Sequence, residues 1–360
     1  MKLIAPKDEL ARALQTVLRS VGARAGIPAL SGVLMELTDA DLTLTTTDLE
    51  LTTRVRMPLS GEAGSVVVPA RYLAEIVRNL RSEDVEFVSD NGTLRITGGR
   101  AKFSLRTLQA EDFPKTEIAE EAHRLSVPAE LFATALAQVA PAASRDETRP
   151  ILTGVLFEGD ESELRLVATD SYRLSLRRIP IQGAAQTKLL VPARAVVEVA
   201  KIATDGDVTI EVSGSQVRFE AGNVSISSRL IEGEFPEYRK LLPTDLPNRL
   251  QISRSRLIES LRQVSVMAQD ATPVFVDLDE GRIRLHCTPQ GLGEADIDIE
   301  GDYTGEPVRA AFNAAYLEAG VSAVETEEIR LELSDPQRPV IVRGTDNDDF
   351  RYLLMPIRVG

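Results

Sequence analysis

The chain has 360 residues, of which 43% are hydrophobic and 27% charged, with a formal net charge of −14. Its length favours two or three domains, and no apolar run approaches the roughly 20 residues that span a bilayer. The N-terminus lacks the apolar core of a signal peptide, and the single Cys287 cannot form an internal disulfide, so we expect a cytoplasmic protein without membrane contact. The acidic balance argues against nucleic-acid binding unless the basic residues gather on one surface.

One phrase recurs along the chain at a spacing of about 122 residues. Residues 27–34 (IPALSGVL) return as residues 149–156 (RPILTGVL), with a weaker copy at 272–276, and Val68-Pro69-Ala70-Arg71 returns 123 residues later. A fixed period in sequence indicates a repeated structural unit. We therefore expect three domains, with the boundaries 1–122, 123–245 and 246–360.

A shorter rhythm within each unit marks the starts of six helices. Prolines follow short apolar runs, and proline suits the first turn of a helix because its missing N–H has no partner there. The third unit offers Ser253 and Asn313 as N-caps instead. Apolar residues such as Leu10, Leu14 and Val17 then repeat with helical spacing. The helical regions, including their flanks, are 7–24, 70–81, 128–145, 193–204, 253–268 and 313–324.

Between these helices, apolar and polar residues alternate, as in 42–45, 94–97, 103–106, 208–211 and 329–333. This period of two is typical of half-buried antiparallel strands. Each half-unit is therefore one helix with three or four strands. The predicted fold class is α+β, with six helices and many antiparallel strands.

The basic residues gather in the predicted helices. Those six regions carry +6, which leaves −20 for the rest of the chain. Cations seven residues apart lie on one helix face, two turns apart. Such a face suits phosphate contact without base readout, whereas for any single helix a solvated surface is the simpler reading. The paired cations are Arg12 with Arg19, Arg71 with Arg78, and Arg194 with Lys201.

The sequence offers little for a catalytic centre, a cofactor or a metal. It contains no glycine-rich phosphate loop. Adjacent His286 and Cys287 would point to opposite faces of a strand, which makes them poor co-ligands. The pairs Thr47-Asp48 and Thr169-Asp170 occupy equivalent positions of the repeat, so we favour turns at strand ends over an acid–base role. We expect no enzyme activity, no cofactor and no metal.

Four stretches of the chain resemble the bacterial DNA polymerase III beta subunit, the replicative sliding clamp. The resemblance covers the whole length and is carried by residues 149–157, 167–174, 234–243 and 352–358. It implies a head-to-tail homodimer that closes into a ring, with helices lining the hole and antiparallel sheets outside. Such a ring would encircle duplex DNA without sequence specificity. It would tether the DNA polymerase III alpha subunit, the clamp-loader complex, and other polymerases and repair proteins that carry a clamp-binding motif.

The resemblance also implies three sets of residues. Arg24 matches a DNA-contacting arginine. At the dimer interface, Phe103 and Leu105 would face the partner near Val266. A pocket for partner peptides would comprise Leu152, Thr169, Tyr172, Arg173, Leu174, Pro236, Lys240, Leu241, Asn313, Tyr316, Met355, Pro356, Ile357 and Arg358.

Two positions depart from the family's pattern and two other functions stay open. Lys240 stands where arginine is common, and Ala271 falls near a position often filled by a bulky residue. A repeat-built protein-interaction scaffold that never meets DNA would explain the basic stripes as solvated faces. A hydrolase would use Asp170 or Asp48.

Overall fold

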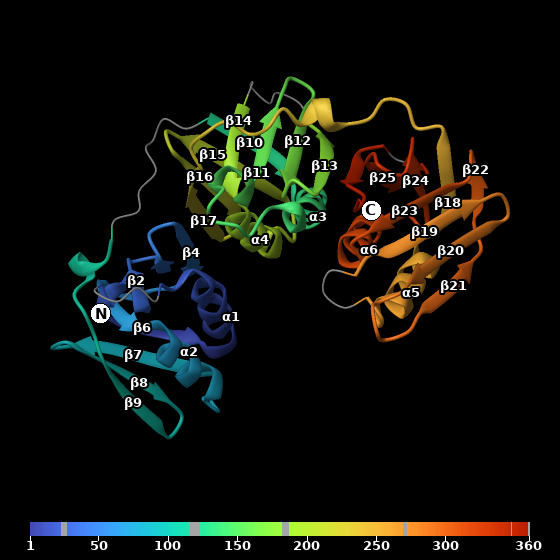
Figure 1. Cartoon of the computed structure of the whole chain (residues 1–360). Coiled ribbons are helices and arrows are strands. Elements are labelled where there is room, and N and C mark those ends of the chain that lie inside the picture. The colour runs from blue at the N-terminus through green and yellow to red at the C-terminus, as the bar shows by residue number, and fades with distance from the viewer. Residues whose placement is uncertain (23–26, 115–122, 182–186, 269–271, 347, 359–360) are drawn as a thin grey trace. The chain divides into compact units, whose positions relative to one another are not determined.

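The computed structural model describes residues 1–22, 27–114, 123–181, 187–268, 272–346 and 348–358. The chain divides into two compact units, and Figure 1 labels helices and strands of both. Unit 1 comprises Met1–Ala133 and Glu198–Leu230, and unit 2 comprises Thr134–Val197 and Ile231–Gly360. The first repeat lies in unit 1 and the third in unit 2, while the second repeat contributes to both. No helix of the described residues is long and apolar enough to cross a membrane.

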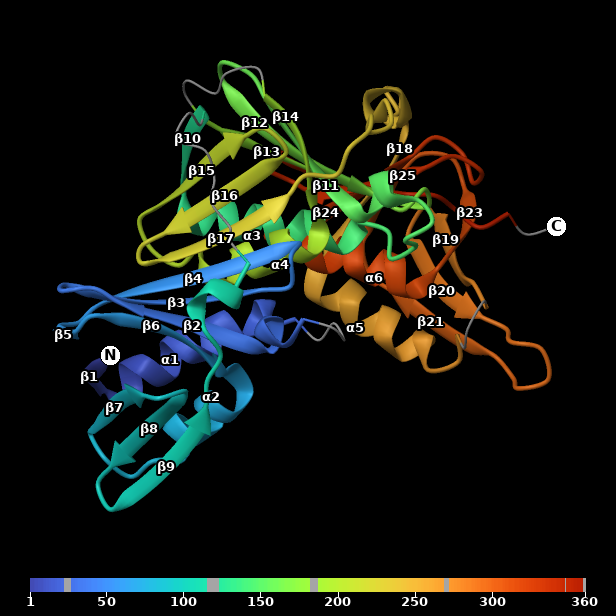
Figure 2. The same ribbon diagram turned by 90° about the vertical axis from the view of Figure 1, so that its left-hand side faces the viewer.

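Unit 1 contains two antiparallel sheets and the helices α1 (Lys7–Val17) and α2 (Ala70–Asn79), which pack against each other (Figure 2). The five-stranded sheet has the order β5 (Gly61–Glu62), β1 (Lys2–Pro6), β7 (Asp84–Asp90), β8 (Thr93–Gly98), β9 (Ala101–Arg106). The eight-stranded sheet has the order β10 (His123–Pro128), β15 (Asp207–Ser213), β16 (Gln216–Ala221), β17 (Val224–Arg229), β4 (Leu51–Pro58), β3 (Asp41–Thr47), β2 (Gly32–Leu37), β6 (Gly64–Pro69).

Unit 2 repeats this plan with the helices α5 (Arg254–Ser265) and α6 (Ala314–Ala323). The nine-stranded sheet has the order β14 (Thr187–Pro192), β11 (Gly154–Gly159), β12 (Glu163–Thr169), β13 (Arg173–Pro180), β26 (Phe350–Leu354), β25 (Val340–Gly344), β24 (Glu328–Leu333), β18 (Asn248–Ser253), β22 (Asp302–Thr304). The four-stranded sheet has the order β21 (Ala295–Ile299), β20 (Arg282–Cys287), β19 (Val274–Asp279), β23 (Val308–Phe312). The division between the units falls within α3 (Ala129–Val139) and α4 (Ala193–Ile202).

Apolar helix faces close against the sheets to form the core of each unit. Leu10, Leu14 and Val17 of α1 are fully buried, as the helical spacing predicted, and they join Phe87 and Leu44 from the strands. Burying side chains of this size is worth about 1.5–3 kcal/mol each. The same arrangement places Leu257 and Leu261 in the core of unit 2.

The predicted α+β class and, within the described residues, the six α-helices are confirmed, and the helices are shorter than expected. Residues 18–20 and 140–142, which were expected to be helical, form 3₁₀ turns instead. Pro6 and Pro69 occupy the N-cap rather than the first helical turn. Ser253 and Asn313 are N-caps as predicted, and the Asn313 side chain accepts a hydrogen bond of 3.1 Å from the Tyr316 N–H.

Sharing of sheets between repeats was not predicted from the sequence. In unit 1, β17 of the second repeat pairs with β4 of the first. In unit 2, β13 of the second repeat pairs with β26 of the third. Each repeat is therefore joined to the next by one continuous sheet.

Candidate functional site

The two Thr-Asp pairs form identical turns rather than acid–base centres. Asp170 Oδ1 accepts hydrogen bonds from the backbone N–H groups of Tyr172 and Arg173 at 2.9 and 3.0 Å. Thr169 Oγ1 donates to the Arg173 carbonyl at 2.7 Å. Asp48 caps the equivalent turn in the first repeat in the same way. Because these carboxylates accept hydrogen bonds from backbone amides of the turn, their role is to stabilise the turn.

The turn at Asp170 orients Arg173, which is the centre of a polar cluster in unit 2. The Arg173 guanidinium donates to Asp170 Oδ2 at 3.0 Å and to the Pro141 carbonyl at 2.6 Å. It also lies over the Tyr316 ring, 4.2 Å from the centroid, a cation–π contact. Tyr352 Oη donates to the Tyr316 carbonyl at 2.8 Å. Arg173 therefore connects the second repeat to the third.

Burial and the neighbouring polar groups together set the protonation of this cluster. Burial raises the pKa of Tyr352 to about 12. Burial opposes the charge of Arg173, but the hydrogen bond to Tyr352 and the neighbouring Asp170 carboxylate raise the pKa of Arg173 overall. The cluster thus keeps a neutral tyrosine beside a fixed cation at neutral pH.

A cavity of about 410 Å³ opens beside Arg173. Three predicted pocket residues, Tyr172, Arg173 and Tyr316, line it. Tyr172 is 62% exposed at its mouth, and the Tyr172 carbonyl accepts a hydrogen bond of 2.8 Å from the Met355 N–H. The C-terminal strand is thereby tied to the edge of the cavity.

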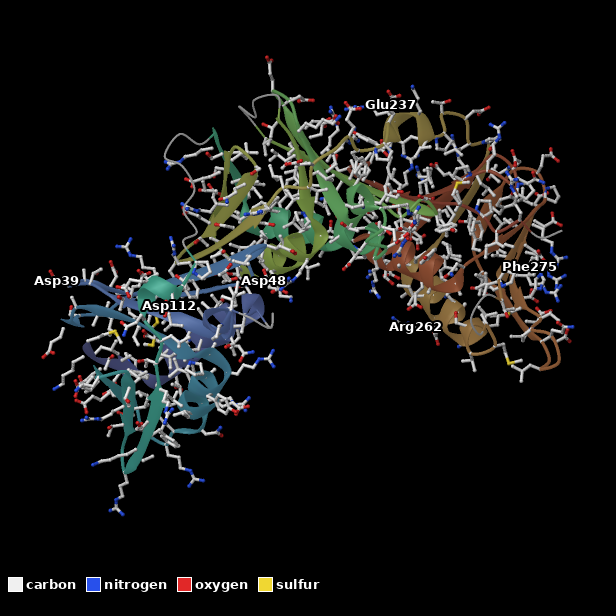
Figure 3. All side chains as sticks on the ribbon, turned by 60° about the vertical axis from the view of Figure 1, so that its left-hand side comes forward. Asp39, Asp48, Asp112, Glu237, Arg262 and Phe275 are labelled. Carbon is white, nitrogen blue, oxygen red and sulfur yellow. The ribbon has the colours of Figure 1, made fainter. Side chains whose placement is uncertain are left out.

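The other predicted pocket residues are distributed around this part of unit 2. Leu174 is buried in the core and Leu152 is nearly so, whereas Leu241, Met355 and Ile357 are exposed apolar side chains. Pro236 and Lys240 line a separate cavity of about 410 Å³. Lys240 forms an ion pair with Glu237, which is labelled in Figure 3. Thr169 and Asn313 have the structural hydrogen bonds described above, Pro356 is half-buried, and Arg358 is exposed.

Sequence reasoning missed several residues of the cavity. Arg145, Asp146 and Arg149 line it together with Ala315. Arg149 belongs to the repeated phrase at residues 149–156. The phrase predicted a repeated structural unit, and nothing in it indicated that Arg149 lines a cavity. Ala271 lies outside the described residues.

The predicted DNA-facing residues fall into two groups. Arg12, Arg71 and Arg78 are exposed and line one groove between α1 and α2, while Arg194 is exposed on α4. Arg19 and Lys201 instead share one carboxylate. Arg19 Nε lies 3.6 Å from Glu198 Oε2, and Lys201 Nζ lies 2.7 Å from Glu198 Oε1. Arg24 lies outside the described residues.

Two of the predicted interface residues lie on an edge strand, and the third follows a helix. Phe103 is 42% exposed on β9, the edge of the five-stranded sheet, and Leu105 follows it on the same face. Val266 is 74% exposed directly after α5. His286 packs on Phe275 while Cys287 is buried on the opposite face. Within the described residues, no cluster of three or more His, Cys, Asp or Glu could hold a metal ion.

Comparisons with known proteins decide the family. Models of the N-terminal, central and C-terminal domains of the DNA polymerase III beta subunit match residues 1–117, 126–237 and 239–358. The beta sliding clamp of Streptomyces coelicolor is 32% identical over the full length of both chains. The chain belongs to the family of DNA polymerase III beta subunits. The beta sliding clamp of Vibrio cholerae is 30% identical, again over both full lengths.

Solved structures of the family have the same fold. The DNA polymerase sliding clamp of Bacillus subtilis superposes with a TM-score of 0.95 at 28% identity, covering all of both chains. A sliding clamp of Pseudomonas aeruginosa bound to griselimycin superposes with a TM-score of 0.96 at 29% identity, also over all of both chains. The three clamp domains and the role in DNA replication follow from this membership. Beta sliding clamps are non-catalytic processivity factors, so the hydrolase alternative is set aside.

Proposed function

We propose that two copies of this sliding-clamp chain close head to tail into a ring that encircles duplex DNA and tethers the replicative polymerase. The observation that carries this proposal is the pattern of strand pairing between repeats. It leaves one complementary pair of sheet edges unused in each chain.

Each repeat contributes two groups of four or five strands, and each group has an outer strand at one end. In the first kind of group, the outer strands are β4, β13 and β21, one from each repeat. In the second kind, the outer strands are β9, β17 and β26. Both junctions within the chain join the two kinds, as β17 with β4 and as β26 with β13. The strands left over are β9 and β21, one of each kind.

A sheet edge presents unpaired backbone N–H and C=O groups that can pair with another chain. If β9 of each copy pairs with β21 of the other, two further junctions form and the assembly closes. A head-to-tail contact that closes gives a ring, whereas one that does not close gives a filament.

The register of this missing junction follows from the two existing ones. Equivalent residues of the three repeats are found by following the paired residues from strand to strand. By this count Arg54, Leu176 and Asp296 are equivalent, one in each repeat. Ser225 pairs with Arg54, and Arg351 pairs with Leu176.

The residue of β9 equivalent to Ser225 is Lys102, because Gly98 pairs with Ala101 as Ala221 pairs with Val224. We therefore expect Lys102 opposite Asp296 of the second copy.

The side chains of the two edges are complementary in this register. Lys102 would lie opposite Asp296, and Arg100 opposite Asp298, all of them exposed. Opposite charges directly across a strand pair contribute about 0.2–1 kcal/mol each. On the helix side of the sheet, Phe103 would lie opposite Ala295, so its exposed ring gains apolar cover.

The helix side supports the same junction. Val266 lies 13 residues after the N-cap Ser253, as Arg19 lies 13 residues after Pro6. Arg19 reaches Glu198 of α4 at the junction in unit 1. An exposed valine at this site suits an apolar contact with α2 of the second copy.

Within the proposed ring, the basic helices face DNA and contact phosphates without reading sequence. The exposed apolar side chains around Tyr172 and Met355 would take short peptides of the DNA polymerase III alpha subunit, the clamp loader and other clamp-binding proteins. We further propose the domain boundaries 1–122, 123–245 and 246–360, and action in the cytoplasm, where bacterial DNA is copied.

Disulfide trapping tests the proposed junction. The double variant Lys102→Cys/Asp296→Cys should yield covalently linked dimers on oxidation, because directly opposed Cα atoms lie about 4.5–5.5 Å apart. The matched control Lys102→Cys/Asp298→Cys shifts one cysteine by two residues, beyond the roughly 7 Å limit for a disulfide. Equal linking in both variants, or none in either, would contradict the junction. An interaction scaffold that remains monomeric would give the second result.

A further inference from the structure

We propose that one groove in the first repeat, between α1 and α2, holds the sugar–phosphate backbone of the encircled duplex, and that the other repeats contribute little. This inference rests on the proposed function, since it names which part of the ring interior binds DNA. The inference depends on which basic side chains already have partners in the structure. The summed charge of the helices does not distinguish one repeat from another.

The groove is a cavity of about 560 Å³. Ala11, Leu18 and Ala74 line it together with Arg12, Arg71 and Arg78, which we call the rim arginines. The two small alanines let a backbone approach closely, while the arginines supply donors for phosphate oxygens.

The three rim arginines are available for a ligand. All three are exposed, and none makes an ion pair or a side-chain hydrogen bond with another described residue. Glu75 is the single carboxylate in the lining. Arg71 and Arg78 lie two turns apart, about 10.5 Å along the helix, which corresponds to about three steps of a DNA strand at 3.4 Å each. The charge and the spacing both suit a phosphodiester backbone.

The second repeat lacks this arrangement. Counted from the helix starts, Thr134 takes the place of Arg12. Arg194 replaces Arg71 but already has a partner within the structure. Lys201 replaces Arg78 and is bound to Glu198 at 2.7 Å. Its cations are therefore fewer and already engaged.

The third repeat lacks it entirely. Glu259 stands at the position of Arg12, and Ala315 and Ser322 stand at those of Arg71 and Arg78. The basic residues of α5 lie elsewhere on the helix, and Arg256 and Arg262 are paired with Glu300 and Glu318 at 2.6 and 2.7 Å. Figure 3 marks Arg262 on the helix layer of this repeat and Phe275 on its sheet layer. Among the described residues, only the first repeat therefore has the cationic groove.

The salt dependence of duplex binding tests this inference. Each lost phosphate contact lowers the slope of log K against log salt by about 0.9. Arg71→Gln/Arg78→Gln removes four arginines from a ring of two copies and should therefore lower the slope by about 3.6, so that raising salt from 50 to 200 mM weakens this variant about 150-fold less than the unaltered protein. The control Arg256→Gln/Arg262→Gln removes two cations from α5 and should leave the slope unchanged.

Two outcomes separate this inference from the ring itself. Equal slopes for both double variants, with normal retention of loaded protein on nicked circular DNA, would overturn the groove and leave the ring intact. Failure of the unaltered protein to stay on circular DNA would instead overturn the proposed function. Thermal melting of both variants should match that of the unaltered protein, because all four side chains are exposed.

Discussion

Reversing one charge on the edge strand β9 should open the proposed ring. In Lys102→Glu, a carboxylate would lie opposite Asp296 of the other copy, and Asp296 already pairs with Arg284 in its own chain. A like-charge pair directly across two strands is destabilising by an amount similar to the gain from an opposite pair. The substitution therefore acts on the junction and leaves the fold of each chain unchanged.

The magnitude follows from the number of junctions. Replacing attraction by repulsion costs about 0.4–2 kcal/mol at each junction. A ring of two copies contains two such junctions, so the dimer loses about 0.8–4 kcal/mol, or roughly 4-fold to several hundred-fold in the dissociation constant. Raising the salt concentration should shrink this effect, because the side chains are exposed and screened.

Sedimentation equilibrium across a dilution series measures that constant. Adding Asp296→Lys to Lys102→Glu restores opposite charges at both junctions and should recover most of the affinity. Lys188→Glu changes an exposed lysine on β14, outside the proposed interface, and should have no effect. An unchanged constant for Lys102→Glu, or no recovery in the double variant, would refute the register derived from the internal junctions.

Three further predictions concern unit 2. Arg173→Ala removes the hydrogen bonds to Asp170 and Pro141, so the free energy of unfolding should fall by about 2–3 kcal/mol in a denaturant titration. Polymerase stimulation should be lost while the dimer persists. The control Arg338→Ala removes an exposed ion pair and should change the free energy of unfolding by less than about 0.5 kcal/mol. Asn313→Ala should cost about 1 kcal/mol through the lost N-cap, and an unchanged melting temperature would contradict that role. Burial raises the pKa of Tyr352 to about 12, so the folded state favours the neutral phenol. This stabilisation should be complete below pH 10 and lost between pH 10 and 12. Tyr352→Phe should flatten the fall in stability over that range, and an equally steep fall in the variant would exclude Tyr352 as its cause.

Local features of this chain could be predicted from its sequence. Helical spacing identified Leu10 and Leu14 as core residues because one helix face must be apolar. The N-caps Ser253 and Asn313 followed from side-chain chemistry, and the Thr-Asp turn followed from its recurrence at equivalent positions. Each of these depends on residues close together in the chain.

Partners distant in sequence could not be predicted in this way. The seven-residue spacing of Arg12 and Arg19 suggested that both bind phosphate. In the structure, Arg19 instead lies beside Glu198, which is far away in the sequence. Strand periodicity likewise shows which face of β4 is buried and says nothing about its neighbour β17. Tyr352 lies in the stretch 352–358, which carried part of the family resemblance. Its contact with Arg173 could not be predicted, because that contact depends on the pairing of β26 with β13.

Retention on DNA of different topology tests the ring most directly. Protein loaded onto a nicked circular duplex should remain bound through gel filtration and should leave when a single cut linearises the circle, because a ring slides off a free end. Blocking both ends of the cut DNA with bulky proteins should restore retention. Equal retention on circular DNA and on linear DNA with free ends would contradict topological binding by this chain.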